Sequence, residues 1–371
     1  MADYRICVVG AGRWGMNHVR TLDRLGYLAG IVESDDYKRN DPKERFSFVP
    51  TFSSIRDAIN EDYDGFTVAT PAETHYEIAK FIIEHGKHVL VEKPITLRAD
   101  EARDLKAMAE AKGVNLMVGH LLLFHPAIRK MKSLIEAGKI GKLQYMYSNR
   151  LNLGTVRTEE NILWSFAPHD ISIFQYFTES FPEDIVSRGG VFLQPGIHDS
   201  SMTILSYPDN RVCHIFVSWL HPFKEHRIVV IGSKGMLSFE DSSSEKHIVF
   251  YEKGIDWIQG EPITRDGPTE VIPYESTFPL DEELKYFAAH LDGQPVEIAD
   301  AQSAVEVLEI LEKATECLIM EGRKSEDRGQ RTEIRGRRSE GGGQGFFAHH
   351  TAEIDEGTTI GDDTKIWHFS H

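Results

Sequence analysis

Short apolar runs alternate with segments of helical spacing along the first third of the chain. Strands are predicted where β-branched and apolar residues cluster, and helices where apolar positions recur every three or four residues. The predicted strands are 5–9, 27–32, 65–69, 88–91 and 115–118, and the predicted helices are 14–25, 74–84 and 100–112. Because strands and helices alternate, we expect a parallel, doubly wound α/β sheet over residues 1–122.

The pattern changes after residue 122. Helical spacing is found at 126–137, 162–176 and 300–320, and short strand patterns at 143–153, 202–207, 212–219, 226–231 and 236–240. The turn-forming sequences Pro208-Asp209-Asn210 and Gly232-Ser233-Lys234-Gly235 separate consecutive strand patterns. We therefore expect an α+β domain with an antiparallel meander over residues 123–322.

The C-terminal part follows neither pattern. Residues 323–345 are rich in Arg, Glu and Gly with few apolar side chains, so we expect a flexible linker. After it, Ile354, Ile360 and Ile366 recur every sixth position, a period typical of a left-handed β-helix. We interpret residues 346–371 as an incomplete hexapeptide-repeat segment. The alternative for this segment is a chance period in a disordered tail. The alternative for residues 323–345 is a basic tract that contacts nucleic acid.

Composition narrows the class of protein. The 371 residues are 41% hydrophobic and 27% charged, which is ordinary for a globular protein, and the formal net charge is −17. A strongly acidic chain disfavours nonspecific binding to nucleic acid or to anionic membranes, so neither partner is expected. No basic and apolar leader precedes Tyr4, and no apolar run reaches about 18 residues. We expect a cytoplasmic protein, and no metal-binding site is predicted.

The turn after the first predicted strand carries the cofactor signal. Gly10 suits a tight turn, Gly12 allows close approach of a pyrophosphate, and Gly15 allows close packing of helix on strand. Glu33 ends the second strand at the spacing of an acid that binds a ribose 2′-hydroxyl and repels a 2′-phosphate, with Asp35 as the competing candidate. This unit favours NAD over NADP. Its predicted cofactor-binding residues are Gly10, Gly12, Arg13, Trp14, Gly15 and Glu33.

A lysine lies at the end of a buried strand. The run Val89-Leu90-Val91-Glu92-Lys93-Pro94 places Lys93 at the carboxyl edge of the sheet, where open α/β sheets bind ligands. Pro94 restricts Lys93 to an extended backbone. Lys93 is positioned to donate a hydrogen bond to a substrate hydroxyl. A lysine that extends from the strand end into solvent is the alternative.

The second polar focus is the segment around His169. It follows a proline near a predicted helix start, so we expect its ring to face a cleft and to act as the base for a hydroxyl proton. Asp170 is either a substrate-binding residue or a helix N-cap. Arg150 and Arg157 bracket Asn152, and two guanidinium groups suit a diphosphate or a carboxylate. Surface ion pairs are the alternative for both arginines.

These residues resemble the glucose–fructose oxidoreductase/inositol dehydrogenase (Gfo/Idh/MocA) family over about residues 4–322. The resemblance rests on the Gly-rich turn, Ala69-Thr70-Pro71 with His75, the run 86–94, the His169 region and the run 232–235. It implies a Rossmann domain, a second domain with an open-faced sheet that forms dimers or tetramers, and NAD(P)-dependent oxidation of a sugar-type alcohol. It implies that Lys93 and His169 are catalytic and that Thr70, Pro71, His75 and Glu92 line the cofactor.

Two positions depart from the family pattern. Many relatives carry an aspartate where this chain has Ser165, and an arginine in the segment 119–124, which has none here. The usual third catalytic group is therefore missing.

The tail resembles the start of hexapeptide-repeat N-acetyltransferases that modify UDP-linked 3-amino sugars, in the runs 351–357 and 366–371. That resemblance points to a UDP-sugar substrate. We predict oxidation of the 3-hydroxyl of a UDP-N-acetylhexosamine or its uronate, in cell-surface polysaccharide biosynthesis. A dehydrogenase of a free polyol such as inositol, a non-catalytic nucleotide-binding regulator and an acetyltransferase are the alternatives.

Overall fold

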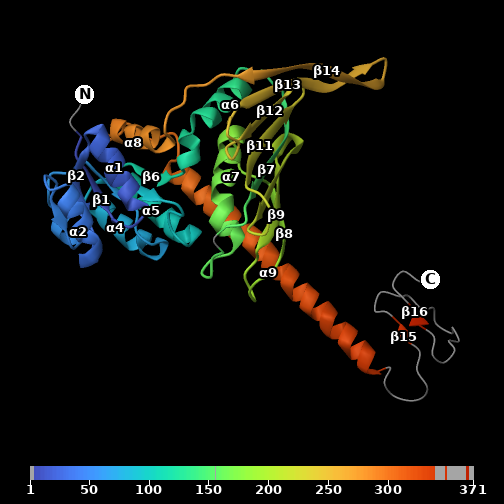
Figure 1. The fold of residues 1–371 in the computed structure, drawn as a ribbon, viewed down its shortest axis with the longest axis horizontal. Helices are drawn as coiled ribbons and strands as arrows, with labels where there is room; N and C mark the ends of the chain where they lie inside the picture. Colours follow the sequence, from blue (N-terminus) through green and yellow to red (C-terminus); the bar gives the residue numbers. More distant parts are fainter. Residues whose placement is uncertain (1–3, 155, 339–346, 349–364, 367–371) are drawn as a thin grey trace. The chain divides into compact units, whose positions relative to one another are not determined.

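The computed structural model describes residues 4–154, 156–338, 347–348 and 365–366. The chain forms two compact units, Met1–Thr315 and Glu316–His371. The first unit contains both large sheets (Figure 1).

A six-stranded parallel sheet forms the N-terminal part. The sequence predicts a parallel sheet here, but not the edge strand β3. Its strand order is β3-β2-β1-β4-β5-β6, so the order reverses between β1 and β4. The strands are β1 Ile6–Val9, β2 Leu28–Val32, β3 Thr51–Phe52, β4 Gly65–Val68, β5 His88–Glu92 and β6 Leu116–Gly119. The helices are α1 Gly15–Leu25, α2 Asp36–Arg45, α3 Ile55–Ala58, α4 His75–Glu84 and α5 Ala99–Lys112, with the short η1 Ala72–Thr74. Ligands bind at such a reversal of strand order.

An eight-stranded sheet forms the second part, in the order β14-β13-β12-β11-β7-β10-β9-β8. The strands are β7 Leu143–Leu151, β8 Asp184–Gly190, β9 Ser200–Tyr207, β10 Arg211–Ser218, β11 Glu225–Gly232, β12 Met236–Glu240, β13 Ile248–Ile258 and β14 Glu261–Ile272. A pure antiparallel meander is wrong, because β7 inserts between β10 and β11 and pairs with β10 in parallel. A strand separated from its neighbours by a helix returns in either direction, so turn chemistry could not reveal this pairing.

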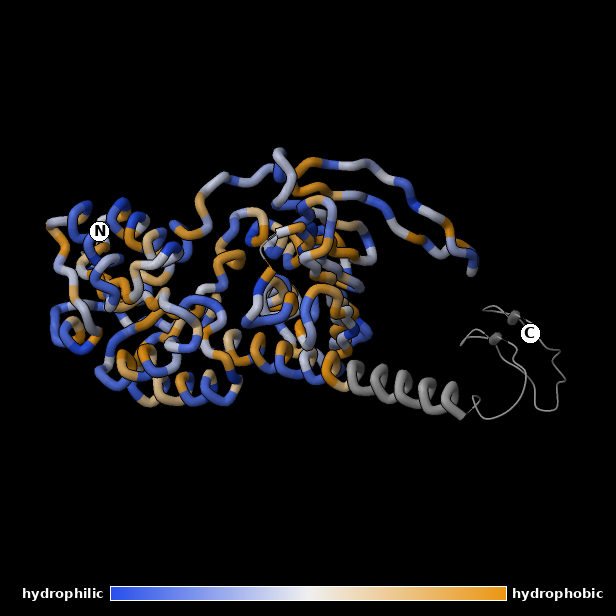
Figure 2. The backbone as a smooth tube through the Cα atoms, turned by 60° about the horizontal axis from the view of Figure 1, so that its bottom comes forward, coloured by the Kyte–Doolittle hydropathy of each residue, from blue (hydrophilic) through white to orange (hydrophobic). Residues whose placement is uncertain are grey.

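Helix α7, Ile162–Thr178, covers one face of the second sheet. It packs on β7, β9 and β10, whose inward residues alternate with half-buried or exposed ones. The remaining helices of this part are η2 Leu121–Phe124, α6 Pro126–Glu136, η3 Pro208–Asn210, α8 Pro279–Ala289 and α9 Ala301–Arg338. Figure 2 shows the apolar segments of the sheet strands and of the helices that pack on them.

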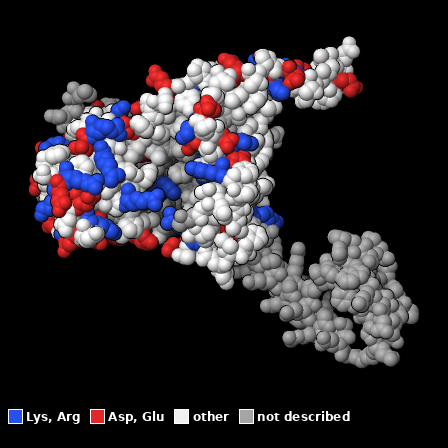
Figure 3. All heavy atoms as spheres, viewed as in Figure 1, with Lys and Arg blue, Asp and Glu red and all other residues white. Residues whose placement is uncertain are grey.

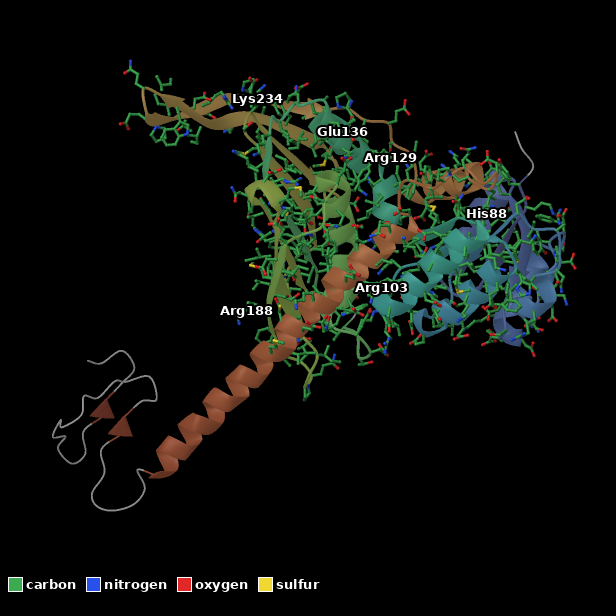
Figure 4. The ribbon with its side chains drawn as sticks, turned by 180° about the vertical axis from the view of Figure 1, so that it is seen from behind. His88, Arg103, Arg129, Glu136, Arg188 and Lys234 are labelled. Atoms are coloured by element: carbon green, nitrogen blue, oxygen red, sulfur yellow. The ribbon has the colours of Figure 1, made fainter. Side chains whose placement is uncertain are left out.

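The chain returns from the second sheet to the first. Helix α8 packs against α1, where Arg24 binds Asp281, and Arg103 of α5 donates to Glu309 of α9 at 2.6 Å. Figure 4 shows Arg103 beside α9. Two helices that come late in the sequence therefore pack against the first domain. A domain boundary at residue 122 leaves these contacts out.

Helix α9 corrects the predicted linker, because it continues to Arg338. Residues 323–338 are helical, where the sequence suggested a flexible tether. Arg, Lys, Glu and Gln are good helix formers, and extending a helix that is already nucleated costs less than starting a new one. Beyond it, β15 Phe347–Ala348 pairs in parallel with β16 Lys365–Ile366. Most of the predicted hexapeptide segment, including Ile354 and Ile360, lies outside the described residues.

Searching the residues that the structure describes finds no helix that is long and apolar enough to cross a membrane.

Candidate active site

Two adjoining cavities lie at the carboxyl ends of β1, β2, β4 and β5. The first, about 660 Å³, is lined by the Gly-rich turn and the end of β2, and the second, about 550 Å³, by the end of β5 and by α7. Arg13, Trp14, Ala69 and Thr70 line both cavities, so they mark the junction. Figure 3 shows Lys and Arg side chains over the N-terminal domain and beside a hollow next to it.

The Gly-rich turn has the geometry that its glycines require. Gly10 has φ +95°, which favours glycine, and its amide donates to the carbonyl of Val32 at 2.8 Å. A Cβ on Gly15 would lie 1.9 Å from the carbonyl oxygen of Gly10, so only glycine permits α1 to begin this close to the turn. A Cβ on Gly12 would meet nothing within 4 Å, which leaves that backbone open toward the cavity.

Glu33 closes the first cavity at the end of β2. Its Oε2 accepts a hydrogen bond from the Ala11 amide at 2.8 Å, and its Oε1 accepts one from the Asp35 amide at 3.0 Å. Asp35 instead caps α2 by accepting from the amides of Tyr37 and Lys38. Each oxygen of Glu33 retains a second lone pair, so the carboxylate still has capacity for a ribose hydroxyl.

His75 connects the ends of two strands. Its Nε2 contacts the carbonyl oxygen of Thr70 at 2.9 Å, and its Nδ1 contacts that of Pro94 at 2.8 Å. Pro71 follows Thr70 and lines the first cavity. The imidazole of His75 therefore connects the segments that follow β4 and β5. His75 supports the shape of the site in this way and also lines the second cavity.

Lys93 extends from the end of β5 into the second cavity. Its peptide bond to Pro94 is cis, and its Nζ donates to the carbonyl oxygen of Ser165 at 3.4 Å. Burial lowers the pKa of Lys93 below its usual range, and the positive charges of Arg150 and Arg157 act in the same direction, against the carboxylates of Glu160 and Glu92. The backbone of Ser165 thus contacts the lysine at the position where many relatives carry an aspartate.

His169 lines the same cavity as Lys93. The prediction that it lies at a helix start is wrong, because α7 begins at Ile162 with Asn161 as its N-cap, which places His169 inside the helix. Burial holds the pKa of His169 well below 6.5, and the charges of Lys93 and Arg150 lower it further. Its Nδ1 is buried and, among the described residues, has no hydrogen-bond partner. A neutral imidazole of this kind accepts a proton.

The predicted substrate residues separate into two groups. Arg157 lines the second cavity. Arg150 does not, because its Nε and Nη2 donate to the carboxylate of Asp170 at 2.7 and 3.1 Å, and both side chains are buried. Asp170 is therefore an ion-pair partner inside α7 rather than an N-cap. The backbone N–H of Asn152 donates a hydrogen bond to the carbonyl oxygen of Ser218, and Asn152 does not line either cavity.

Glu92, which the family resemblance predicts to line the cofactor, is buried and lines the second cavity. The carboxylate of Glu92 accepts hydrogen bonds from Trp14 Nε1 at 2.5 Å and from the Lys93 amide at 3.2 Å, and lies 2.8 Å from His18 Nε2. Burial lowers the pKa of the nearby His120 to about 3. His18 and His120 lie in apolar patterns without a motif, so only the folded structure reveals them.

The donor set fits a nicotinamide dinucleotide. The first cavity combines an open Gly-rich backbone with a carboxylate for a ribose, and the second is lined by both an amine and an imidazole. The arrangement suits proton transfer at an alcohol next to a hydride acceptor. Lys93 and His169, the two predicted catalytic residues, thus line the same cavity.

Comparisons with known proteins agree with this geometry. Residues 4–120 match the family model described as the oxidoreductase family with an NAD-binding Rossmann fold, and residues 128–238 match the GFO/IDH/MocA C-terminal domain.

The chain is similar to the UDP-N-acetylglucosamine 3-dehydrogenase of Acidithiobacillus ferrooxidans, with 25% identity over 78% of this chain and 90% of the relative. It is also similar to the scyllo-inositol 2-dehydrogenase (NAD(+)) of Bacillus subtilis, with 26% identity over 63% of this chain and 72% of the relative.

A solved structure of the Acidithiobacillus ferrooxidans enzyme has the same fold. Its TM-score to this chain is 0.75 at 22% sequence identity, over 86% of this chain and 98% of the other.

Proposed function

The chain belongs to the GFO/IDH/MocA oxidoreductase family, and from that premise we propose that it oxidises the 3-hydroxyl of a UDP-N-acetylhexosamine or its uronate. Its cofactor is NAD, and its reaction class is the oxidation of a CH–OH group. The single observation that carries the proposal is the shared cavity of Lys93, His169 and Arg157 beside the dinucleotide cavity.

His169 and Lys93 have different roles at the substrate hydroxyl. Bound NAD supplies the hydride acceptor. As the C–H electron pair leaves the carbinol carbon and the C=O bond forms, the O–H bond breaks and its proton passes to the neutral imidazole of His169. Lys93 donates a hydrogen bond to the same oxygen and stabilises the negative charge that develops on it.

Arg157 supports an anionic substrate. It lines the catalytic cavity and its Nε lies 4.0 Å from the carboxylate of Glu160 in an exposed ion pair, whereas the guanidinium of Arg150 is buried against Asp170. A guanidinium binds a diphosphate or a carboxylate with two parallel hydrogen bonds. We therefore assign the diphosphate or the uronate of the sugar nucleotide to Arg157, and to Arg150 a supporting role.

A free polyol is the second candidate substrate, favoured by the similarity to the inositol dehydrogenase. Measuring NADH formation with UDP-N-acetylglucosamine, UDP-N-acetylglucosaminuronate and the inositols distinguishes a UDP-sugar substrate from a free polyol. We expect turnover with a UDP-sugar. Turnover with inositols alone would replace the substrate assignment, and NAD binding without any turnover would indicate a regulator.

The Lys93→Met variant tests the chemical role. It removes the amine while keeping a flexible side chain, so we expect turnover to fall by at least about a thousandfold, a loss of roughly 4 kcal/mol, with NAD affinity within a few-fold of the wild type. Lys106→Met is the matched control, because Lys106 pairs with Glu110 on the outer face of α5. Unchanged kcat in Lys93→Met would remove Lys93 from the mechanism.

Three broader expectations belong to the same proposal. We propose that the protein acts in the cytoplasm in polysaccharide biosynthesis and that its second sheet forms a dimer or tetramer. We also propose that residues 346–371 begin a hexapeptide-repeat segment. The parallel pairing of Phe347 with Lys365 and of Ala348 with Ile366 is consistent with stacked β-helix coils.

A further inference from the structure

The proposed base, His169, has a ring nitrogen for which the site described above supplies no partner. Its Nδ1 is buried and has no hydrogen bond among the described residues, although the side chain lines the catalytic cavity. Because Nδ1 is buried, Nε2 is the nitrogen available to the substrate. A neutral imidazole carries a hydrogen on one nitrogen and a lone pair on the other. For Nε2 to accept a proton, Nδ1 must therefore carry the hydrogen, and that hydrogen needs an acceptor.

The acceptor that other histidines of this chain use is not used by His169. Two of them place Nδ1 2.7 Å from the carbonyl oxygen four residues earlier, and these pairs are His85 with Phe81 and His290 with Tyr286. The corresponding carbonyl oxygen for His169 is that of Ser165, which accepts from Lys93 Nζ at 3.4 Å. The helix backbone therefore does not fix the tautomer of His169.

His120 lies beside the catalytic lysine, at the end of the neighbouring strand. β5 and β6 are parallel, and Glu92 is paired in register with Gly119. The next residue on each strand end is Lys93 on one side and His120 on the other. Gly119 and Leu121, the chain neighbours of His120, line the catalytic cavity. His120 thus belongs to the wall of the active site, although its own side chain does not line that cavity.

The side chain of His120 instead lines a small cavity behind the two catalytic residues. The cavity measures about 10 Å³, and Pro94 and Pro168, the residues next to Lys93 and His169, line it as well. The short helix η2, which follows His120, also packs on α7, which carries His169. A cavity of this size holds at most one water molecule. The remaining lining residues are apolar, and they are Ile95, Val118, Ala304, Val307, Leu308 and Leu311.

His120 is itself a buried group without a partner. It is 2% exposed, and neither ring nitrogen has a hydrogen bond in the part of the chain that the structure describes. Burial, and then the charge of Lys93, lowers its pKa to about 3, so the ring is neutral at neutral pH and has a lone pair to offer. An unpartnered buried polar group costs about 1–3 kcal/mol. Two imidazoles that both lack a partner therefore lie on either side of the Pro168 segment.

We propose that His120 is a positioning residue whose ring accepts the hydrogen of His169 Nδ1, directly or through the one water molecule for which the small cavity has room. This inference rests on the proposed function, because it deepens the role of His169 as the base. The hydrogen on Nδ1 stays in place throughout the reaction. The substrate proton arrives on Nε2, and the same hydrogen bond then stabilises the imidazolium. His120 thus supplies an orienting group in a chain that has Ser165 where many relatives carry an aspartate.

The tautomer of His169 tests the proposal without any substrate. Long-range proton–nitrogen NMR spectra of the full chain, labelled in its histidines, report which ring nitrogen carries the hydrogen, and the signal that disappears in His169→Gln identifies His169. We expect the Nδ1–H form in the wild type at neutral pH. In His120→Leu the Nε2–H form should appear, because Nδ1–H has lost its acceptor. An unchanged Nδ1–H form in His120→Leu would overturn the proposal.

Turnover provides a second readout, because a positioning residue changes kcat much more than KM. In His120→Leu we expect kcat to fall about 10- to 100-fold, as is typical when a group that orients a functional histidine is removed. KM and NAD affinity should stay within a few-fold of the wild type. The amide oxygens of His120→Asn and His120→Gln reach different positions of the imidazole ring, so one of these variants should recover most of the loss. Equal kcat in the wild type and His120→Leu would contradict the assignment.

Thr67→Val is the matched control. Thr67 is fully buried in β4, and its Oγ1 also lacks a hydrogen bond within the described ranges. Removing this hydroxyl should leave both kcat and the His169 tautomer unchanged, which separates the role of His120 from the general effect of deleting a buried polar group. His120→Met should behave as His120→Leu does, which guards against a packing defect specific to one side chain.

The two proposals fail in different ways. If neither a UDP-sugar nor an inositol is oxidised, the proposed function fails, while the tautomer spectra still decide the role of His120. If a UDP-sugar is oxidised and the tautomer of His169 is the same with and without the imidazole of His120, only the present inference fails.

Discussion

The buried pair of Arg150 and Asp170 gives the sharpest test of how the second domain supports the site. Asp170→Ala leaves the guanidinium of Arg150 buried without its carboxylate, although the two groups now share hydrogen bonds of 2.7 and 3.1 Å and are 7% and 1% exposed. Breaking a buried ion pair by removing one partner costs about 3–5 kcal/mol. We expect that loss in the free energy of unfolding.

The matched comparison is the true N-cap of α7. Asn161 accepts a hydrogen bond from the Trp164 amide at 3.1 Å, so Asn161→Ala should cost about 1 kcal/mol. Urea denaturation followed by circular dichroism gives both values from the midpoint and slope. A double variant, Arg150→Met with Asp170→Leu, removes both charges together and should recover most of the loss.

The two values test whether the ion pair of Asp170 with Arg150 stabilises the fold more than a helix cap does. If Asp170→Ala cost no more than Asn161→Ala, the ion pair would contribute no more than a helix cap, and the reasoning from burial and geometry would be refuted. A double variant as unstable as Asp170→Ala would refute the account as well, because the penalty would then come from packing rather than from an unpaired charge.

Two other predictions follow from the site. Burial and the charges of Lys93 and Arg150 hold the pKa of His169 well below 6.5, so its imidazole is neutral at pH 6.5 and is protonated only at lower pH. We therefore expect kcat to fall on the acidic side only below pH 6.5. An acidic fall centred at or above pH 6.5 would contradict His169 as the base. Glu33→Gln removes the charge that repels a 2′-phosphate, so the ratio of kcat/KM for NAD over NADP should fall about tenfold, a change of roughly 1.4 kcal/mol; an unchanged ratio would transfer that role to Asp35.

The first domain was predictable because its signals are local. Strands and helices alternate within a few residues of the observed bounds, and Gly10 and Gly15 occupy positions that a side chain cannot. Lys93 could be placed at a sheet edge because a parallel strand ends there. Each of these inferences depends only on residues close together in the sequence.

The second domain was less predictable. Parallel pairing of β7 with β10 depends on contacts between segments about 70 residues apart, and α8 and α9 pack on a domain that ended well before them. The position of His169 was misjudged because a proline can lie in the first turns of a helix whose cap is several residues upstream. Local turn chemistry does not encode these arrangements.

The sequence by itself determined the dinucleotide turn and the lysine at the end of β5, since each is marked by residue types that its local backbone requires. Only the tertiary structure decided that Arg150 is committed to Asp170, that Arg157 faces the cavity, and that Glu92 collects Trp14, His18 and the Lys93 amide. The reason is physical: charge state and hydrogen-bond partners depend on burial and on neighbours brought together from distant parts of the chain.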